Sequence, residues 1–149
     1  MIDKIIQEVR ACTGCAACYN ICPNEAITIE LTEGFYRPSI DQGKCVSCKK
    51  CVKVCPQNRD VGSSLFETRA YAAKNTDAQS RIKSTSGGIF PLMAEYILNL
   101  GGVVYGVAFS ENYLAKHIRI EKEGDLSKIR GSKYLQSYVG DTYKKSSWI

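Results

Sequence analysis

One cysteine motif occurs twice in the chain. The first copy, CTGCAACYNICP, occupies residues 12–23, and the second, CVSCKKCVKVCP, occupies residues 45–56. Both copies follow the pattern C-x2-C-x2-C-x3-C-P and together contain all eight cysteines of the chain. Eight thiols at fixed spacings require a fold that either binds metal with them or pairs them as disulfides.

Three chemistries compete for these thiols. Zinc usually uses separate C-x2-C pairs, often with histidine, and the single histidine, His117, lies far from both motifs. Disulfides between such closely spaced cysteines would be strained, and a thioredoxin-type motif needs only one C-x-x-C unit. The spacing therefore favours two [4Fe-4S] clusters, and a non-redox zinc or RNA-binding module is the alternative from another class.

The spacing also predicts which cysteines share a cluster. Three closely spaced thiolates hold three irons of one cube, while the cysteine before the proline points to the other cluster. We therefore expect one cluster on Cys12, Cys15, Cys18 and Cys55, and the other on Cys45, Cys48, Cys51 and Cys22. This exchange would link the two motifs into one module.

Composition limits the class of protein further. Of the 149 residues 44% are hydrophobic and 23% are charged, as in folded soluble proteins. The N-terminal MIDKIIQEVR has no apolar core of a signal peptide, and no apolar run is long enough to span a membrane, so we expect a cytoplasmic protein. The formal charge of +5 would fall to about +1 with two clusters bound, and the lysines lack interleaved aromatic residues, so no nucleic-acid partner is expected.

Residues 2–57 resemble the bacterial two-cluster ferredoxins. Between the motifs, alternating apolar residues predict a hairpin around a Glu33-Gly34 turn, with Ile27 and Ile29 before it and Tyr36 and Ile40 after it. This is too little apolar surface for an independent core. We therefore expect the clusters to serve as the core and the module to unfold when they are lost.

The chain changes character after residue 57. Residues 57–64 read as a linker, residues 67–75 as a buried strand, and residues 77–82 as a short helix capped by Asp77. Residues 89–100 predict an amphipathic helix, residues 103–109 and 115–121 predict an antiparallel strand pair, and Asp141 begins a helix. The apolar residues expected on the packed face of the long helix are Ile89, Leu92, Met93, Tyr96, Ile97 and Leu100. The predicted fold is α+β, a ferredoxin-like domain over 1–60 followed by a partial α/β domain over 61–149.

Several segments in this second region are candidates for function. The helix start at 84–88, STSGG, suits an anion but also suits an ordinary capped helix. The segment GGVVYG lies in a strand, not at the start of a helix, and His117 alternates as an edge residue does, so neither predicts a site. The run RGSKYLQS, residues 130–137, combines glycine, hydroxyls, lysine and tyrosine outside any regular period.

Four segments of the second region follow one another in the order SGGIFPLMAEYIL, GGVVYGVAF, KHIRIE and RGSKYLQS. In this order they resemble the N-terminal domain of the family of coenzyme F420 hydrogenase/dehydrogenase beta subunits. The resemblance covers residues 70–145 and implies flavin-linked electron transfer, with FAD or FMN and possibly F420 as cofactors. By this resemblance the flavin or deazaflavin site would be lined by Ser86, Gly87, Gly88, Gly131, Ser132, Lys133 and Tyr134. Members of the family continue into a larger C-terminal domain, whereas this sequence ends at DTYKKSSWI, so we expect an incomplete flavin site and a fragment of the whole protein.

The sequence thus predicts an iron-sulfur electron carrier that belongs to an F420- or flavin-linked oxidoreductase. Its expected partner is a redox protein or a flavin-bearing subunit. The rival interpretation is a complete flavin-dependent oxidoreductase whose site is finished by a partner chain.

Overall fold

The computed structural model of the chain describes residues 12–58 and 69–146 and divides into two units. One unit comprises Met1–Leu65 together with Val139–Ile149, and the other comprises Phe66–Tyr138. The expected domain boundary at residue 60 and most of the expected linker lie outside the described residues, so both stay predictions. The sequence did not predict that Val139–Ile149 would join the unit that contains the cysteines.

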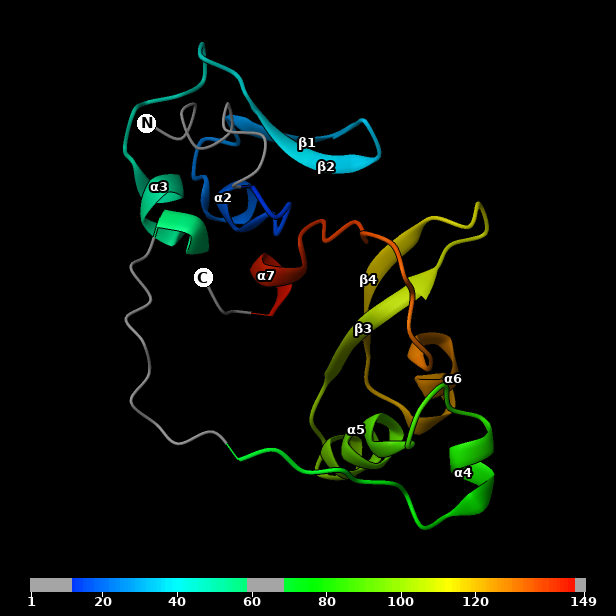
Figure 1. The fold of residues 1–149 in the computed structure, drawn as a ribbon. Helices are drawn as coiled ribbons and strands as arrows, with labels where there is room; N and C mark the ends of the chain where they lie inside the picture. Colours follow the sequence, from blue (N-terminus) through cyan, green and yellow to red (C-terminus); the bar gives the residue numbers. More distant parts are fainter. Residues whose placement is uncertain (1–11, 59–68, 147–149) are drawn as a thin grey trace. The chain divides into compact units, whose positions relative to one another are not determined.

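A hairpin, three short α-helices and one 3-10 helix make up the described part of the cysteine-bearing unit (Figure 1). Strand β1 (Ile27–Thr32) pairs antiparallel with β2 (Phe35–Ile40), with Ile27 opposite Ile40. Both turn residues have positive φ, 51° at Glu33 and 82° at Gly34, as a two-residue turn that matches the strand twist requires. The predicted hairpin is confirmed.

The helices of this unit lie next to the cysteines. Helix α2 (Ala17–Ile21) packs against α3 (Lys50–Val54), and the 3-10 helix η1 (Pro56–Asn58) follows α3. Helix α7 (Thr142–Lys145) packs against α2, as the red and blue helices of Figure 1 show.

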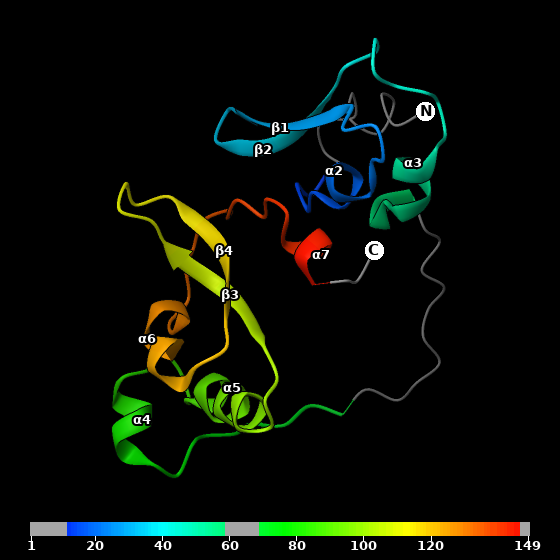
Figure 2. The same cartoon turned by 180° about the vertical axis from the view of Figure 1, so that it is seen from behind.

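The second unit is a strand hairpin covered by helices (Figure 2). Strand β3 (Val104–Phe109) pairs antiparallel with β4 (Ala115–Ile120), as predicted. Its helices are α4 (Ala78–Ile82), α5 (Ile89–Asn99), η2 (Glu123–Asp125) and α6 (Leu126–Ile129). The predicted cap is also confirmed, because the Asp77 side chain accepts a hydrogen bond from the Gln79 N–H.

Helices α5 and α6 both contact β3 and enclose a small hydrophobic core. Its buried members are Ala94, Leu98, Ala108, Ile120, Leu126 and Ile129. A Cβ atom added at Gly106 would lie 2.8 Å from the Ile129 side chain, so glycine at this position lets α6 approach the strand closely.

Two expectations for this unit are wrong. The described part of the predicted strand, residues 69–75, is not a strand, since it has no strand partner and Tyr71 is exposed. The expected packed face of α5 is also wrong: the helix buries Pro91, Ala94 and Leu98, while Leu92, Met93, Tyr96, Ile97 and Leu100 are all exposed.

The described residues therefore form a small α+β structure with two antiparallel two-stranded sheets. This agrees with the predicted ferredoxin-like domain, whereas the partial α/β domain stays a prediction. None of the helices in residues 12–58 and 69–146 is long and apolar enough to cross a lipid bilayer.

Candidate iron-sulfur site

The structure gathers the eight cysteines around two separate cavities. One cavity is lined by Cys12, Cys15, Cys18 and Cys55, with Pro38 and Pro56 among its other walls. The second cavity is lined by Cys22, Cys45, Cys48 and Cys51, with Ile27, Ile40 and Val52. Each cavity thus combines three cysteines of one motif with the cysteine before the proline of the other, which is the grouping expected from the spacing.

The two motifs also share one backbone conformation. Residues at matched positions adopt the left-handed region: Gly14 and Ser47, with φ of 67° and 55°, and Ala16 and Lys49, with φ of 58° and 61°. The chain then enters α2 and α3, and the N–H groups of Cys22 and Cys55 donate to the carbonyls of Tyr19 and Val52, both at 3.4 Å. The spacing therefore produces the same loop and helical turn twice.

Burial and crowding favour the neutral form of two of the thiols, Cys18 and Cys51. Burial, together with the neighbouring Cys15, Cys12 and Cys51, raises the pKa of Cys18 to about 12. Burial also raises the pKa of Cys51, with Cys48 and Cys22 as its charged neighbours. Four thiolates in one cavity therefore require a strongly cationic group between them, and binding of that group releases protons.

Among the described residues, the cysteines around each cavity are not arranged to hold a single metal ion. Zinc would require all four sulfurs within about 2.3 Å of a single point. Within residues 12–58 and 69–146, no three cysteine, histidine or acidic side chains converge closely enough to hold one metal ion. Four cysteines spaced around a cavity instead match an iron-sulfur cube, whose irons each take one thiolate. One ligand also accepts a backbone hydrogen bond, because the Ala26 N–H donates to the Cys22 sulfur at 3.4 Å.

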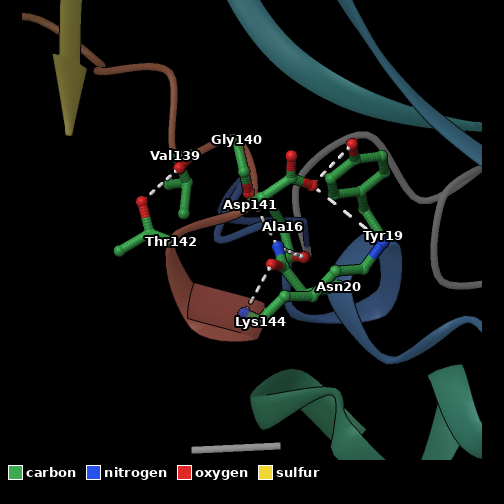
Figure 3. A network of polar contacts seen from close by, with 8 residues as sticks. All are labelled: Ala16, Tyr19, Asn20, Val139, Gly140, Asp141, Thr142 and Lys144. Carbon is green, nitrogen blue, oxygen red and sulfur yellow. Dashed lines mark hydrogen bonds and ion pairs between the residues drawn. The ribbon is translucent and has the colours of Figure 1, made fainter. Parts of the chain in front are cut away.

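Residues 139–146 form a polar clamp on α2 (Figure 3). The Tyr19 hydroxyl donates to Asp141 Oδ1 at 2.9 Å, and the Asn20 side-chain amide donates to the Gly140 carbonyl at 2.9 Å. The Lys144 N–H donates to Asn20 Oδ1 at 3.2 Å, and the Lys144 ammonium lies 5.1 Å from the centre of the Tyr19 ring. The hydrogen-bonded partners are far apart along the chain, so no local signal in the sequence indicates this contact.

The clamp also reaches the first cysteine set. Burial raises the pKa of Tyr143, and the charge of the nearby Cys15 also raises it. On another side, the Arg37 guanidinium donates to the Cys12 carbonyl. The first set is therefore supported by the β-hairpin and by the C-terminal clamp.

The residues expected at a flavin site are brought together in part. Ser86, Gly87 and Gly88 line one cavity of about 430 Å³ together with Gly131 and Ser132. Lys133 lines a neighbouring cavity instead, and its ammonium donates to the carbonyls of Arg130 and Gly131 at 2.9 and 3.0 Å. Tyr134 is 91% exposed and lines neither of these two cavities.

The 430 Å³ cavity has features that suit an anionic group. It opens at the N-terminus of α5, where Gly88 has a φ of 74° and precedes the free N–H groups of the first turn. Arg130 lines the cavity, and its Nε is a buried donor without a hydrogen-bond partner. A Cβ atom added at Gly87 would lie 2.5 Å from the Ala73 carbonyl oxygen, so this wall requires glycine. Sequence reasoning did not single out Arg130 as a cavity residue.

The fold and the cysteine cavities together define an iron-sulfur protein of the two-cluster ferredoxin type. The 4Fe-4S dicluster domain matches residues 11–59, and a second form of the same domain matches residues 37–88. An uncharacterized ferredoxin of Methanocaldococcus jannaschii is 33% identical over 58 residues, which cover 39% of this chain and 75% of that protein. Through this segment the chain belongs to the ferredoxin family.

Two further relatives are components of oxidoreductases by name. The F subunit of the F(420)H(2) dehydrogenase of Methanosarcina mazei is 25% identical over 93% of this chain, and the chain spans 42% of its length. The B subunit of the ion-translocating oxidoreductase complex of Methanosarcina acetivorans is 44% identical over 36% of this chain, which corresponds to 19% of that relative. These matches support iron-sulfur electron transfer as the function of the chain.

Proposed function

We propose that the chain carries single electrons between two [4Fe-4S] clusters. Cys12, Cys15, Cys18 and Cys55 hold one cluster, and Cys22, Cys45, Cys48 and Cys51 hold the other. The observation that carries this proposal is the grouping of the cysteines around two cavities, each of which takes three residues from one motif and one from the other. When bound, the clusters supply reversible one-electron chemistry.

The residues of the chain have distinct tasks in this function. The thiolates bind iron, and the paired helices α2 and α3 fix the distance between the two cavities. The backbone N–H of Ala26, which donates to the Cys22 sulfur, stabilises the anionic form of that ligand. Pro38, which is buried, helps to close the first cavity against water.

Iron and acid-labile sulfide analysis tests this function after anaerobic reconstitution. We expect about eight irons and eight sulfides per chain, with a broad brown absorption that bleaches when dithionite is added. Four irons or fewer, or a colourless protein that contains zinc, would contradict the proposal and favour the non-redox alternative.

A second function is supported by the cavity between the SGG and RGS segments. We infer that the Phe66–Tyr138 unit binds the phosphate of a flavin there, with the N–H groups of the α5 N-terminus and the Arg130 guanidinium as donors. The support is the unpartnered Arg130 Nε together with the similarity to a relative whose name refers to F(420)H(2). When bound, a flavin would link two-electron hydride donors to the one-electron clusters.

Flavin binding is measured by calorimetric titration of the holoprotein with FMN and with FAD. Gly131→Val should weaken binding about tenfold, because Gly131 lines the cavity with a φ of 84° that a β-branched residue rarely adopts. The matched control is Gly124→Val, at a glycine with open space around it. Equal affinities in all three proteins, or no binding at all, would remove the flavin site from the proposal.

Hydride donors are then tested one at a time. Reduced F420, NADH and NADPH are each supplied with added flavin and a dye acceptor, and dithionite serves as the one-electron control. For this chain alone we expect dye reduction with dithionite only, because hydride transfer needs a flavin held rigidly and screened from water, and Tyr134 is exposed and does not cover the cavity. Turnover with a hydride donor would instead favour the complete oxidoreductase.

A further inference from the structure

The two copies of the cysteine motif differ in charge at matched positions. Where the first copy has Ala16, Ala17 and Asn20, the second has Lys49, Lys50 and Lys53. All three lysines are exposed, and Lys49 and Lys50 line the cavity of the second cysteine set. Because the two backbones are alike, the motif itself does not require lysine at these positions.

The copies differ in exposure as well. Cys45 and Cys48 are exposed, whereas the matched Cys12 and Cys15 are only partly so. Around the first set, Ala16 and Asn20 are buried, and the C-terminal clamp packs on α2. Among the described residues, the main contacts of α3 are with α2 and η1. The second set is therefore the one that solvent or a partner can reach most directly.

An exposed apolar residue lines the same cavity as Lys49 and Lys50. Val46, between Cys45 and Cys48 in sequence, is 61% exposed. We call the surface formed by Val46, Lys49, Lys50 and Lys53 with the two exposed cysteines the basic face. Protein contact surfaces usually combine exposed apolar side chains with a polar rim.

The charges of the basic face favour an acidic partner. An oxidised cube with four thiolates carries a net charge of about −2, which alone would repel an acidic surface. Lys49, Lys50 and Lys53 outweigh that charge and balance the charge of about −3 that a reduced cube carries, while Lys44 lies 3.9 Å from Asp41 and is partly neutralised by it. At the first set, the matched positions carry no such lysines. The charge around each cluster thus distinguishes the two ends of the relay.

We propose that the basic face docks an acidic one-electron redox protein and that electrons enter or leave the chain there through the second cluster. This inference rests on the proposed cluster function and deepens it by naming the exchange site and the class of partner. A protein partner fits better than a lipid surface, because two exposed cluster ligands lie among the lysines and lipid accepts no electrons. In each transfer one reduced cluster loses one electron and the metal or flavin of the partner gains it, with no bond made or broken.

The test uses the reconstituted full chain, reduced with dithionite and mixed rapidly with one of two oxidants. Plastocyanin, an acidic blue-copper protein, represents the proposed partner, and cytochrome c, a basic haem protein, is the opposite case. The rate constant for plastocyanin should fall about tenfold from low to high ionic strength, because salt screens the attraction. The rate constant for cytochrome c should fall less steeply, because Lys49, Lys50 and Lys53 repel a basic partner from this face.

The decisive variant replaces the three lysines with the residues of the first motif, as Lys49→Ala, Lys50→Ala and Lys53→Asn. It should reduce plastocyanin about tenfold more slowly than the wild type at low ionic strength and equally fast at high ionic strength. A variant with glutamine at all three positions has long side chains without the charge and should show the same decrease in rate. Iron and sulfide content is measured in every variant, so that a loss of clusters is not read as a loss of docking.

The matched control removes three exposed lysines from the other unit, as Lys74→Ala, Lys83→Ala and Lys122→Asn, and should keep the wild-type rates. If the rate constant for plastocyanin depends neither on ionic strength nor on the three substitutions, the basic face is not a docking site. Vesicles of phosphatidylglycerol and phosphatidylcholine test the lipid alternative. If the wild type binds them and the lysine variant does not, while the plastocyanin rates are unchanged, the lysines serve a membrane surface and the proposal is overturned. A wild-type protein that dithionite does not bleach would reduce neither oxidant and would overturn the cluster function together with the inference.

Discussion

Asn20 connects the first cysteine motif to the C-terminal clamp through two hydrogen bonds and makes a third within the motif. Its amide donates to the carbonyls of Ala16 and Gly140, and its oxygen accepts from the Lys144 N–H. Asn20 is 4% exposed, and removal of its side chain would leave the Gly140 carbonyl and the Lys144 N–H without this partner, whereas the Ala16 carbonyl would keep its bond from the Asn20 backbone N–H. The matched residue in the second motif is Lys53, which is exposed.

Asn20→Ala should therefore loosen the clamp. The expected cost is about 1–3 kcal/mol, the penalty for leaving a buried polar group unsatisfied. It should appear as faster hydrogen exchange of the Lys145 and Ser146 amides in the holoprotein, since both amides are bonded within the α7 segment. The control is Asn58→Ala, which removes only a long, exposed hydrogen bond to Val52 and should change exchange little. Unchanged exchange in Asn20→Ala would show that the clamp does not depend on this residue.

The cysteine before each proline decides which cluster a substitution damages. Cys22 lines the cavity of Cys45, Cys48 and Cys51, although its own neighbours in sequence are Cys15 and Cys18. Cys22→Ala should therefore disturb the distant cluster and lower the iron content from about eight towards about four per chain. The paramagnetic spectrum of the remaining reduced cluster should match that of the first set.

Cys55→Ala is the matched substitution in the second motif and should damage the cluster of Cys12, Cys15 and Cys18 instead. Each variant should thus retain the signal that the other loses. If Cys22→Ala lost the cluster of Cys12, Cys15 and Cys18, the assignment of ligands across the motifs would be wrong.

At the scale of elements, the sequence predicted those whose signals are local. The hairpin was correct because the Glu33-Gly34 turn and the alternation around it all lie in the short stretch from Ile27 to Ile40. The prediction of helix α4 was correct because the residue that caps the helix, Asp77, directly precedes it in the sequence. The strand at 67–75 was wrong, because a strand requires a partner that no local pattern supplies; the Asn75 N–H instead donates to the Gly87 carbonyl.

Helix α5 shows why a burial face is harder to predict than a helix. Its sequence, IFPLMAEYILN, is apolar almost all round, with Glu95 and Asn99 as the most polar residues. The 3.6-residue period therefore fits two faces, one with Pro91, Ala94 and Leu98 and another with Leu92, Met93 and Tyr96. The small residues determine the packed face, because Ala94 lets the helix approach the core closely.

The exposed face of α5 should make the chain associate. Met93 is 64% exposed, and Tyr96 and Leu100 in the same row are exposed too. Replacing Met93 and Tyr96 with lysine should lower the apparent mass in sedimentation at high concentration, since large exposed apolar patches drive self-association. Thermal stability should change little, because both positions are exposed.

Leu98→Ala is the contrasting substitution on the same helix. Leu98 is buried and belongs to the core, so its truncation should cost about 2–5 kcal/mol without changing association. A lysine variant that unfolds, or one that associates as the wild type does, would show that the exposed face has another role.

At the scale of the whole molecule, the two units are stabilised by different means. The hydrophobic core lies entirely between Ala94 and Ile129, in the second unit. Among the described residues of the first unit, the buried apolar side chains are Ala16, Ala26, Ile27 and Pro38, and two of these are single methyl groups. So few apolar atoms do not offset the conformational entropy lost on folding, and the clusters must therefore supply the remaining stability.

Removal of iron should therefore unfold one unit and spare the other. Chelation under anaerobic conditions should abolish the exchange protection of the β1–β2 hairpin and of α7, because a structural metal contributes its binding free energy to folding. Amides of β3 and β4 should stay protected, since Leu98, Ile120 and Ile129 still pack on that hairpin. Exchange is followed by mass spectrometry of peptic fragments, and reconstitution with iron and sulfide should restore the lost protection. Loss of protection in both hairpins together would mean that the chain folds as one cooperative body, and retention of the first hairpin without iron would show that its fold does not depend on the clusters.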